Sequence, residues 1–242
     1  MRTGHIPRFH VAAGLSSGAQ IDLPRDAAHH ATRVLRLRVG ESLTLFDGTG
    51  GEYEAQITSI GRDRISVAIG EHRALERESP LAVTLVQGIA GADRMDFIIQ
   101  KAVELGAAAI QPVLTSKSVV RLSKERAEAR LAHWQRIVIA ACEQCGRNRI
   151  PEVFPAESLA QYSAPQGAVK VMLSPQAPRD LKAIARSPLI LAVGPESGFD
   201  SAEEQLLAQK GFVGARLGPR TLRTETAALA ALAALNALQG DF

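Results

Sequence analysis

The chain has 242 residues, 46% of them hydrophobic, with a formal net charge of +3. These values predict a globular protein with a sizeable core, arranged as one large domain or two ordinary ones. The N-terminus lacks the apolar region of a signal peptide, and the apolar stretch 227–238 is too short to span a bilayer, so we expect a cytoplasmic protein with no membrane partner.

The first part of the chain has the pattern of short strands separated by glycine-rich turns. The predicted strands are Leu43–Phe46, Tyr53–Ile60 and Arg64–Ile69. Asp47–Gly51 joins two of them and is predicted to be a hairpin turn rather than a phosphate loop. Only His29–Arg38 has a helical pattern, which would place Arg33 and Arg36 one turn apart on one face. We expect a small β-rich barrel or sheet.

A charged segment that ends at a proline, Glu71–Pro80, is typical of a linker. We therefore place a domain boundary there and predict domains at residues 1–73 and 74–242.

The second domain alternates between strand and helix patterns. Its predicted strands are Ala82–Ile89, Ile110–Leu114, Val169–Leu173, Leu189–Val193 and Phe212–Leu217. Its predicted helices are Asp93–Leu105, Lys124–Gln144, Asp180–Ala185, Ser201–Lys210 and Glu225–Leu238. Asp93 is the expected cap of the first helix, and Ser201 with Glu204 is the expected capping box of the fourth. This alternation predicts an α/β fold with a largely parallel sheet.

Two glycine-containing turns follow neighbouring strands near the end of the chain, in Leu189–Gly198 (LILAVGPESG) and Leu217–Ala228 (LGPRTLRTETAA). Such loops commonly form a ligand crevice, because their backbone N–H groups and the following helix N-termini converge there. Neither turn has the glycine spacing that binds nucleotide phosphates, which disfavours a phosphate-bearing cofactor.

The pair Cys142 and Cys145 has the C-x-x-C spacing of zinc and redox sites. No second pair completes four ligands, and the two cysteines lie within a helical pattern. We predict reduced thiols and no metal site.

Motifs along most of the chain closely resemble the RsmE family, the uridine-N3 methyltransferases of 16S ribosomal RNA within the SPOUT class. They are RFHV, HHATRVLRLRVGE, DRMDFIIQKAVELGAAAIQPV, WQRIVIAACEQCGRNRIPEV, GPESGF and LGPRTLRTETA. The resemblance implies a SPOUT-type trefoil-knotted methyltransferase domain, preceded by a small PUA-like RNA-binding domain. The family usually has Gly-Pro-Glu-Gly-Gly where this chain has Ser197, and a non-glycine residue costs about 1 kcal/mol if that position needs positive φ.

The resemblance also implies a cofactor and a substrate. S-adenosylmethionine would be held by Leu173, Gly194, Pro195, Glu196, Gly198, Leu217, Gly218, Leu222 and Arg223. The substrate would be 16S rRNA, within an assembled or nearly assembled small ribosomal subunit.

Removal of the uridine N3 proton requires a base or stabilisation of the resulting anion. Arg223 is the candidate for stabilising that charge, and Glu225 is the candidate base. A carboxylate in the first turn of a helix also has an ordinary structural role there, and Glu196 has the same two interpretations.

Five arginines are the candidate RNA contacts implied by the resemblance: Arg8, Arg33, Arg36, Arg94 and Arg147. Without it, Arg33 and Arg36 would be part of a solvated face, and Arg147 would complement a helix dipole. Composition adds little, because the excess of arginine over lysine can also reflect genomic G+C content.

The final helix suggests self-association. Its residues Leu229, Leu232, Leu235 and Leu238 recur at every third position and spread over a broad arc that one neighbour would not cover. We expect a homodimer that uses this helix or Lys124–Gln144. Two other functions stay open: a SPOUT enzyme that methylates a ribose 2′-hydroxyl or a guanine nitrogen, and an RNA-binding protein that has lost catalysis.

Overall fold

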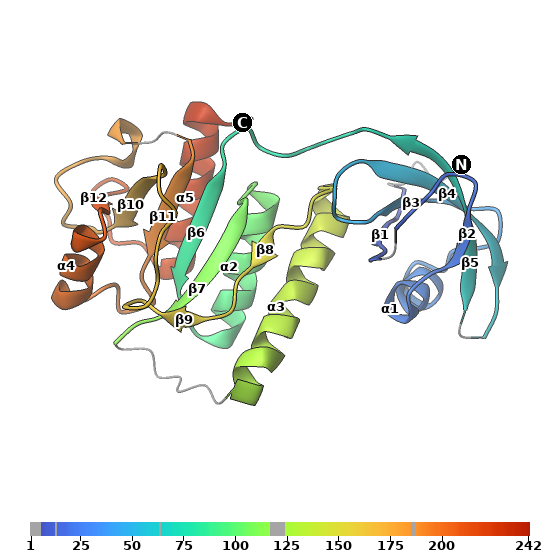
Figure 1. The fold of residues 1–242 in the computed structure, drawn as a ribbon, viewed down its shortest axis with the longest axis horizontal. Coiled ribbons are helices and arrows are strands. Elements are labelled where there is room, and N and C mark those ends of the chain that lie inside the picture. The colour runs from blue at the N-terminus through green and yellow to red at the C-terminus, as the bar shows by residue number, and fades with distance from the viewer. Residues whose placement is uncertain (1–5, 13, 63, 117–123, 185–186) are drawn as a thin grey trace. The chain divides into compact units, whose positions relative to one another are not determined.

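The computed structural model describes residues 6–12, 14–62, 64–116, 124–184 and 187–242. The chain forms two compact units (Figure 1). The N-terminal unit comprises Met1–Glu78 together with Cys142–Ile150, and the C-terminal unit comprises Ser79–Ala141 and Pro151–Phe242. The segment 142–150, which returns to the N-terminal unit, has no counterpart in the sequence prediction.

A five-stranded sheet in the order β1-β3-β4-β5-β2 forms the N-terminal unit. The strands are β1 (Arg8–His10), β2 (Gln20–Asp22), β3 (Ser42–Phe46), β4 (Glu52–Ile60) and β5 (Ile65–Arg73). The β1–β3 pair is parallel, and the pairs among β2 to β5 are antiparallel. Residues 47–51 connect β3 to β4, as predicted. The short strands β1 and β2 were not predicted.

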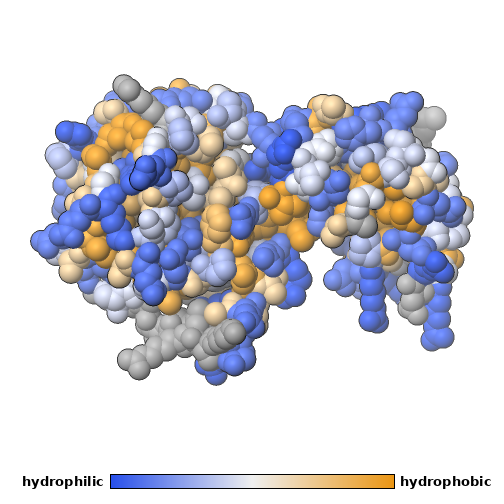
Figure 2. Space-filling view, in the orientation of Figure 1, coloured by the Kyte–Doolittle hydropathy of each residue, from blue (hydrophilic) through white to orange (hydrophobic). Residues whose placement is uncertain are grey.

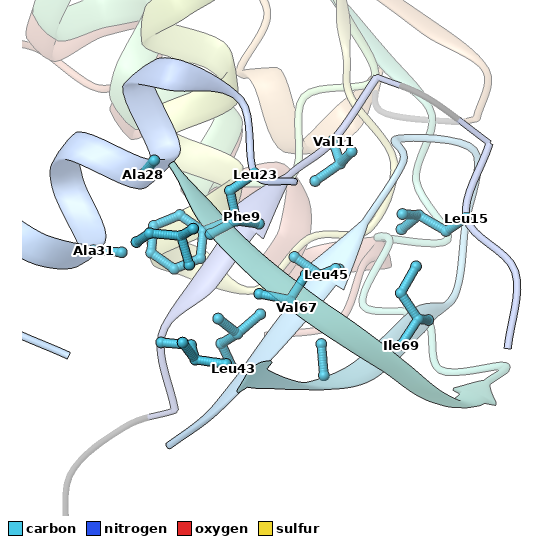
Figure 3. Packing of buried hydrophobic residues seen from close by; sticks show 13 residues of the cluster. Phe9, Val11, Leu15, Leu23, Ala28, Ala31, Leu43, Leu45, Val67 and Ile69 are labelled. Carbon is cyan, nitrogen blue, oxygen red and sulfur yellow. The ribbon is translucent and has the colours of Figure 1, made fainter. Parts of the chain in front are cut away.

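The core of this unit lies on one face of the sheet (Figure 3). Side chains alternate between the two faces of a strand, so every second residue of β3 and β5 can be buried. Those buried include Leu43, Leu45, Val67 and Ile69, which lie with Phe9, Ala28 and Ala31 in one cluster. The β-rich unit predicted from the sequence is therefore present.

The helix of this unit begins and ends earlier than predicted. It runs through α1 (Arg25–His29) and continues without a break as a π-helix, η1 (His30–Val34). Arg36 has a φ of 55°, and the Leu37 N–H bonds to the Ala31 carbonyl, so the helix cannot continue to Arg38.

The sheet of the C-terminal unit has seven strands, and its order is β12-β10-β11-β6-β7-β8, with β9 paired to β7. The strands are β6 (Val83–Gly88), β7 (Ala109–Leu114), β8 (Glu152–Val153), β9 (Glu157–Ser158), β10 (Val169–Leu173), β11 (Leu189–Val193) and β12 (Val213–Ala215). All their pairings are parallel. The central strand β11 is buried along its whole length, as its continuous apolar sequence indicates.

Two helices of the C-terminal unit have N-caps that differ from those predicted. The helices are α2 (Ala92–Glu104), α3 (Lys124–Cys145), α4 (Ser201–Gln209) and α5 (Thr224–Gln239), with a 3₁₀ turn η2 (Leu181–Ala183), and the last four residues of α3 belong to the N-terminal unit. The cap of α2 is Gly91 rather than Asp93, and no side chain caps it. The capping box of α4 is Asp200 with Glu203, because Asp200 rather than Ser201 is the extended residue before the helix.

One further predicted helix differs from the structure. The helix expected at Asp180–Ala185 is only the short turn η2, and its predicted last residue lies outside the described residues. Within the described ranges, no helix is long and apolar enough to cross a membrane.

The last segment of the chain returns from the sheet edge to its centre. After β12, at the edge, α5 packs against α2, β6, β11 and η2 (Figure 1). Leu232 and Leu235 are buried in these contacts, whereas Leu238 is 53% exposed near the end of the helix.

Candidate active site

A cleft of about 310 Å³ lies in the C-terminal unit, where β10, β11 and β12 end. Three loops line it: residues 173–176 after β10, 193–199 after β11 and 215–222 after β12. Because parallel strands have their carboxyl ends at the same edge of the sheet, these loops converge. The volume is within the range of small-molecule sites.

The cleft brings together most residues predicted to hold a cofactor. The predicted residues that line it are Leu173, Gly194, Pro195, Glu196, Gly198, Leu217, Gly218 and Leu222. Arg223 does not line it and is instead the exposed residue at the N-cap of α5. Arg216 and Arg220, which were not predicted, are also in the lining.

At two glycines of this cleft the backbone is not covered by a side chain. Gly198 and Gly218 have φ values of 69° and 71°, and no atom lies within 4 Å of where a Cβ atom would stand. Ser197 does not have a positive φ; within the described residues only Arg36 among non-glycines does. The strain considered for Ser197 therefore does not arise.

Glu196 anchors the loop after β11 to the start of α2. Its Oε1 accepts hydrogen bonds from the Gly91 N–H at 2.8 Å and from Arg94 Nη1 at 2.7 Å. Burial acts to raise the pKa of this carboxyl, but the hydrogen bonds and the Arg94 charge outweigh burial and lower it. A carboxylate with a lowered pKa is a weak base, so Glu196 has the structural role.

Glu225 differs from Glu196 in its surroundings. It lies in the first turn of α5, and its Oε2 is buried without a hydrogen-bond partner among the described residues. A buried carboxylate oxygen without a donor retains the capacity to accept a proton. Glu225 is not among the residues that line the cleft, and its role as a base stays a prediction.

A neutral network, which we name the amide–hydroxyl network, lies at the wall of the cleft and consists of the Gln87 amide, the Thr224 hydroxyl and the Gly194 carbonyl; Thr224 and Gly194 are part of the lining. Gln87 Nε2 donates to Thr224 Oγ1 at 3.0 Å, and Thr224 Oγ1 donates to the Gly194 carbonyl at 2.6 Å. Sequence reasoning missed both side chains. Gln87 did carry a signal, because it is the amide side chain within the otherwise apolar pattern of β6.

The predicted RNA contacts are in different environments. Arg33 and Arg36 are exposed on the N-terminal unit, where hydrophilic residues project over α1 (Figure 2). Arg94 is half-exposed and paired with Glu196. Arg8 and Arg147 are buried, with 5% of each side chain exposed, in ion pairs with Glu52 and Glu78.

The buried arginine Arg8 belongs to what we name the ionic network: Arg8, Glu52, Arg77 and Asn148. Glu52 Oε2 accepts from Arg8 Nη1 at 2.6 Å and from Arg77 Nη1 at 3.1 Å. Asn148 accepts from Arg8 and donates to the Leu75 carbonyl. These bonds join the two segments of the N-terminal unit, which supports a structural role for Arg8 rather than RNA contact.

Comparison with known proteins identifies the family. Residues 77–236 match a family described as an RNA methyltransferase domain, and residues 23–70 match an RNA methyltransferase PUA domain. A ribosomal RNA small subunit methyltransferase E from Buchnera aphidicola is 33% identical over 98% of both chains. The chain belongs to this family. The resemblance to the RsmE family noted from sequence motifs is thereby confirmed, and the protein is an RNA methyltransferase with an N-terminal PUA-like domain.

Solved structures of methyltransferases have the same fold. A ribosomal RNA small subunit methyltransferase E from Neisseria gonorrhoeae, bound to S-adenosyl methionine, is 43% identical with a TM-score of 0.91, over 98% of this chain and 100% of that one. A Legionella pneumophila methyltransferase with bound SAM is 36% identical with a TM-score of 0.95, over 99% of this chain and 100% of that one. The SPOUT-type α/β fold predicted from the sequence is confirmed.

Proposed function

We propose that this methyltransferase transfers the methyl group of S-adenosylmethionine to N3 of a uridine in 16S rRNA. The observation that carries the proposal is the cleft between the three loops, in a chain of the ribosomal RNA small subunit methyltransferase E family. Relatives named ribosomal RNA small subunit methyltransferase E, and similar structures that hold the cofactor, support it.

The lining of the cleft fits the chemistry of this cofactor. Leu173, Leu217 and Leu222 offer apolar walls to a purine base, and the bare backbone at Gly198 and Gly218 lets a ligand approach closely. Both charge signs in the lining suit an amino-acid group that carries an ammonium and a carboxylate. When bound, S-adenosylmethionine supplies an electrophilic methyl group on a positively charged sulfur.

The residues of the chain would then position the uridine and manage its proton. N3 of uracil carries a proton that must leave as the new N–C bond forms. We assign its removal to Glu225, whose Oε2 has no hydrogen-bond partner among the described residues. We assign Arg223, two positions earlier, to stabilising the negative charge that develops on the uracil oxygens.

Three further assignments complete the proposal. Arg33 and Arg36 contact RNA from the N-terminal unit, and the 16S rRNA is presented within an assembled or nearly assembled small subunit in the cytoplasm. The chain acts as a homodimer through α5 or α3, and light scattering that gives a monomer mass with activity retained would refute that part. The N-terminal unit serves as the RNA-binding part.

Nucleoside mass spectrometry tests the activity directly. Small subunits from cells that lack the protein, incubated with it and S-adenosylmethionine, should gain 3-methyluridine at one position. Glu225→Gln should lower kcat by about 100-fold or more with little change in cofactor affinity. Appearance of a 2′-O-methylated nucleoside or a methylguanosine would identify another SPOUT activity, and cofactor binding without methylation would indicate an RNA-binding protein.

A further inference from the structure

We infer that Gln87 and Thr224 are positioning residues that hold the first cofactor loop, residues 194–198, in its binding shape. This inference rests on the proposed function, because it takes the cleft to be the site of S-adenosylmethionine. Neither side chain would transfer a proton or a methyl group. Their role is to fix the Gly194 carbonyl, and with it the backbone of the loop.

Three segments far apart in sequence meet at the Gly194 carbonyl. Thr224 Oγ1, at the start of α5, donates to it at 2.6 Å, and Gln87 Nε2, near the end of β6, lies 3.4 Å from it. Gln87 Nε2 also donates to Thr224 Oγ1 at 3.0 Å, so the hydroxyl both accepts and donates. The loop at residues 194–198 and the start of α5 are thus joined through the Gly194 carbonyl and the Thr224 hydroxyl.

The packing around this network leaves the loop little freedom. A Cβ atom at Gly88 would lie 2.6 Å from the backbone N of Pro195, and one at Gly194 would lie 2.7 Å from the carbonyl carbon of Gly198. The end of β6 therefore lies directly against the loop, and the loop folds tightly on itself. Removal of the Thr224 hydroxyl would leave the Gly194 carbonyl with only the longer contact from Gln87 Nε2 among the described residues, so the carbonyl would be underbonded.

The amide–hydroxyl network leaves one buried polar atom unpaired, which lowers stability rather than raising it. Gln87 is fully buried, yet its Oε1 has no hydrogen-bond partner among the described residues. Buried polar atoms are normally paired, and departures from that rule concentrate at functional sites. An apolar side chain would fill this place in β6 without an unpaired oxygen, which indicates that the amide is kept for the loop that it holds.

The opposite end of α5 offers a matched control. Asn236 is also buried, and its Nδ2 donates to the Leu105 carbonyl at 2.6 Å while its Oδ1 accepts from Ser79 Oγ at 2.7 Å. It ties the same helix to neighbouring segments with a similar number of bonds, but it does not line the cleft. Loss of these bonds should affect stability and leave the cofactor loop in place.

The experiment compares Thr224→Val, Thr224→Ser, Gln87→Leu and Asn236→Leu in the full chain. Isothermal calorimetry gives the Kd for S-adenosylmethionine, and urea unfolding gives stability. We expect Thr224→Val, which keeps the shape and loses the hydroxyl, to weaken binding about ten-fold, equivalent to about 1.4 kcal/mol. Gln87→Leu should weaken it similarly, whereas Thr224→Ser, which keeps the hydroxyl, and Asn236→Leu should stay within about two-fold of the unsubstituted protein.

The outcomes separate this inference from the proposed function. If the unsubstituted protein binds S-adenosylmethionine and folded Thr224→Val binds it equally well, the positioning role is wrong and the proposed function stands. If Asn236→Leu weakens binding as much as Thr224→Val, the effect is one of general stability and the inference is also wrong. If the unsubstituted protein shows no saturable binding, both ideas fail. If Gln87→Leu does not fold, the comparison of Thr224→Val with Thr224→Ser tests the inference by itself.

Discussion

The two units of this protein use buried polar groups in opposite ways. In the N-terminal unit the ionic network places charged Arg8 and Glu52 beneath the surface, with side chains 5% and 8% exposed. In the C-terminal unit the amide–hydroxyl network is neutral, and the charged Glu196 and Arg94 remain at the surface. Charge is therefore buried where the two segments of the N-terminal unit are tied together, whereas the Gly194 carbonyl at the cleft is held by neutral groups.

This contrast has an energetic reason. Two buried opposite charges cost desolvation energy and repay it only with good geometry, but removal of one partner leaves the other uncompensated. The ionic network therefore makes the contact between the two segments of the N-terminal unit sensitive to substitution. Neutral hydrogen bonds are individually weaker, yet they fix a loop without shifting the pKa of groups that must handle a proton. The networks therefore predict different losses on mutation.

The largest effect is expected from breaking the ionic network. Glu52→Ala leaves Arg8 buried without its carboxylate and should reduce the free energy of unfolding by about 3–5 kcal/mol, measured by urea unfolding. Glu54→Ala is the control on the same strand, because Glu54 pairs with Arg73 and both side chains are more than half exposed. The control should change stability by less than about 1 kcal/mol. Equal losses in the two variants would contradict the structural role of the ionic network.

A smaller effect on stability but a large one on binding is expected from the cofactor loop. Gly194→Ala places a Cβ atom 2.7 Å from the backbone of Gly198 and Phe199, so the loop must open. We expect the affinity for S-adenosylmethionine to fall about 100-fold, or about 2.7 kcal/mol, in a protein that still unfolds cooperatively. Calorimetry on the folded variant checks this, and unchanged affinity would show that the loop does not contact the cofactor.

The exposed arginines should contribute only to RNA binding. Arg33→Ala with Arg36→Ala should weaken binding of a 16S rRNA fragment about ten-fold at low salt and flatten the dependence of log Kd on log salt by about one or two phosphate contacts. Cofactor affinity should not change. The control removes two charges from the β4–β5 turn of the same unit, Arg62 and Arg64, both exposed. An equal loss of RNA affinity in the control would show that the effect comes from net charge alone.

The smallest effect is one of pH on the ionic network. Burial acts to raise the pKa of Glu52, but hydrogen bonds from Arg8 and Arg77 lower it overall. A carboxyl whose folded pKa is lowered contributes stability above its ordinary pKa of about 4.3, and that contribution is lost as pH falls from there through the folded value. The stability difference between the unsubstituted protein and Glu52→Gln should therefore shrink below about pH 4. A constant difference between about pH 6 and pH 3 would contradict this sign.

Sequence patterns predicted the C-terminal unit better than the N-terminal one. The predicted strands Val169–Leu173 and Leu189–Val193 coincide with β10 and β11, and β11 is the continuous apolar sequence expected of a buried parallel strand. Strands β1 and β2 have three residues each and depend on partners distant in sequence, so local periodicity does not show them. The π-helix after α1 is likewise invisible to a pattern that assumes 3.6 residues per turn.

Within the site, the loops were predictable and the contacts were not. Glycine and proline mark the turns at 194–198 and 217–222, and these turns line the cleft. Whether a buried polar residue is a support or a ligand contact depends on its partners, as with Gln87 and Thr224. The same limit applies to Arg8, which forms a hydrogen bond with a residue 140 positions away and has no local feature that predicts burial.

The discontinuous N-terminal unit has a consequence for the order in which the protein is made. Residues 1–78 leave the ribosome well before Asn148, which hydrogen-bonds to Arg8, Glu52 and the Leu75 carbonyl. At about 5–20 residues per second, translation of the intervening chain takes several seconds. During that time the Arg8–Glu52 pair lacks its amide partner, so the ionic network stays incomplete although all five strands of the sheet have been synthesised. The N-terminal unit of this chain is thus begun first, but it can be completed only after residues 79–141 of the C-terminal unit have also been synthesised.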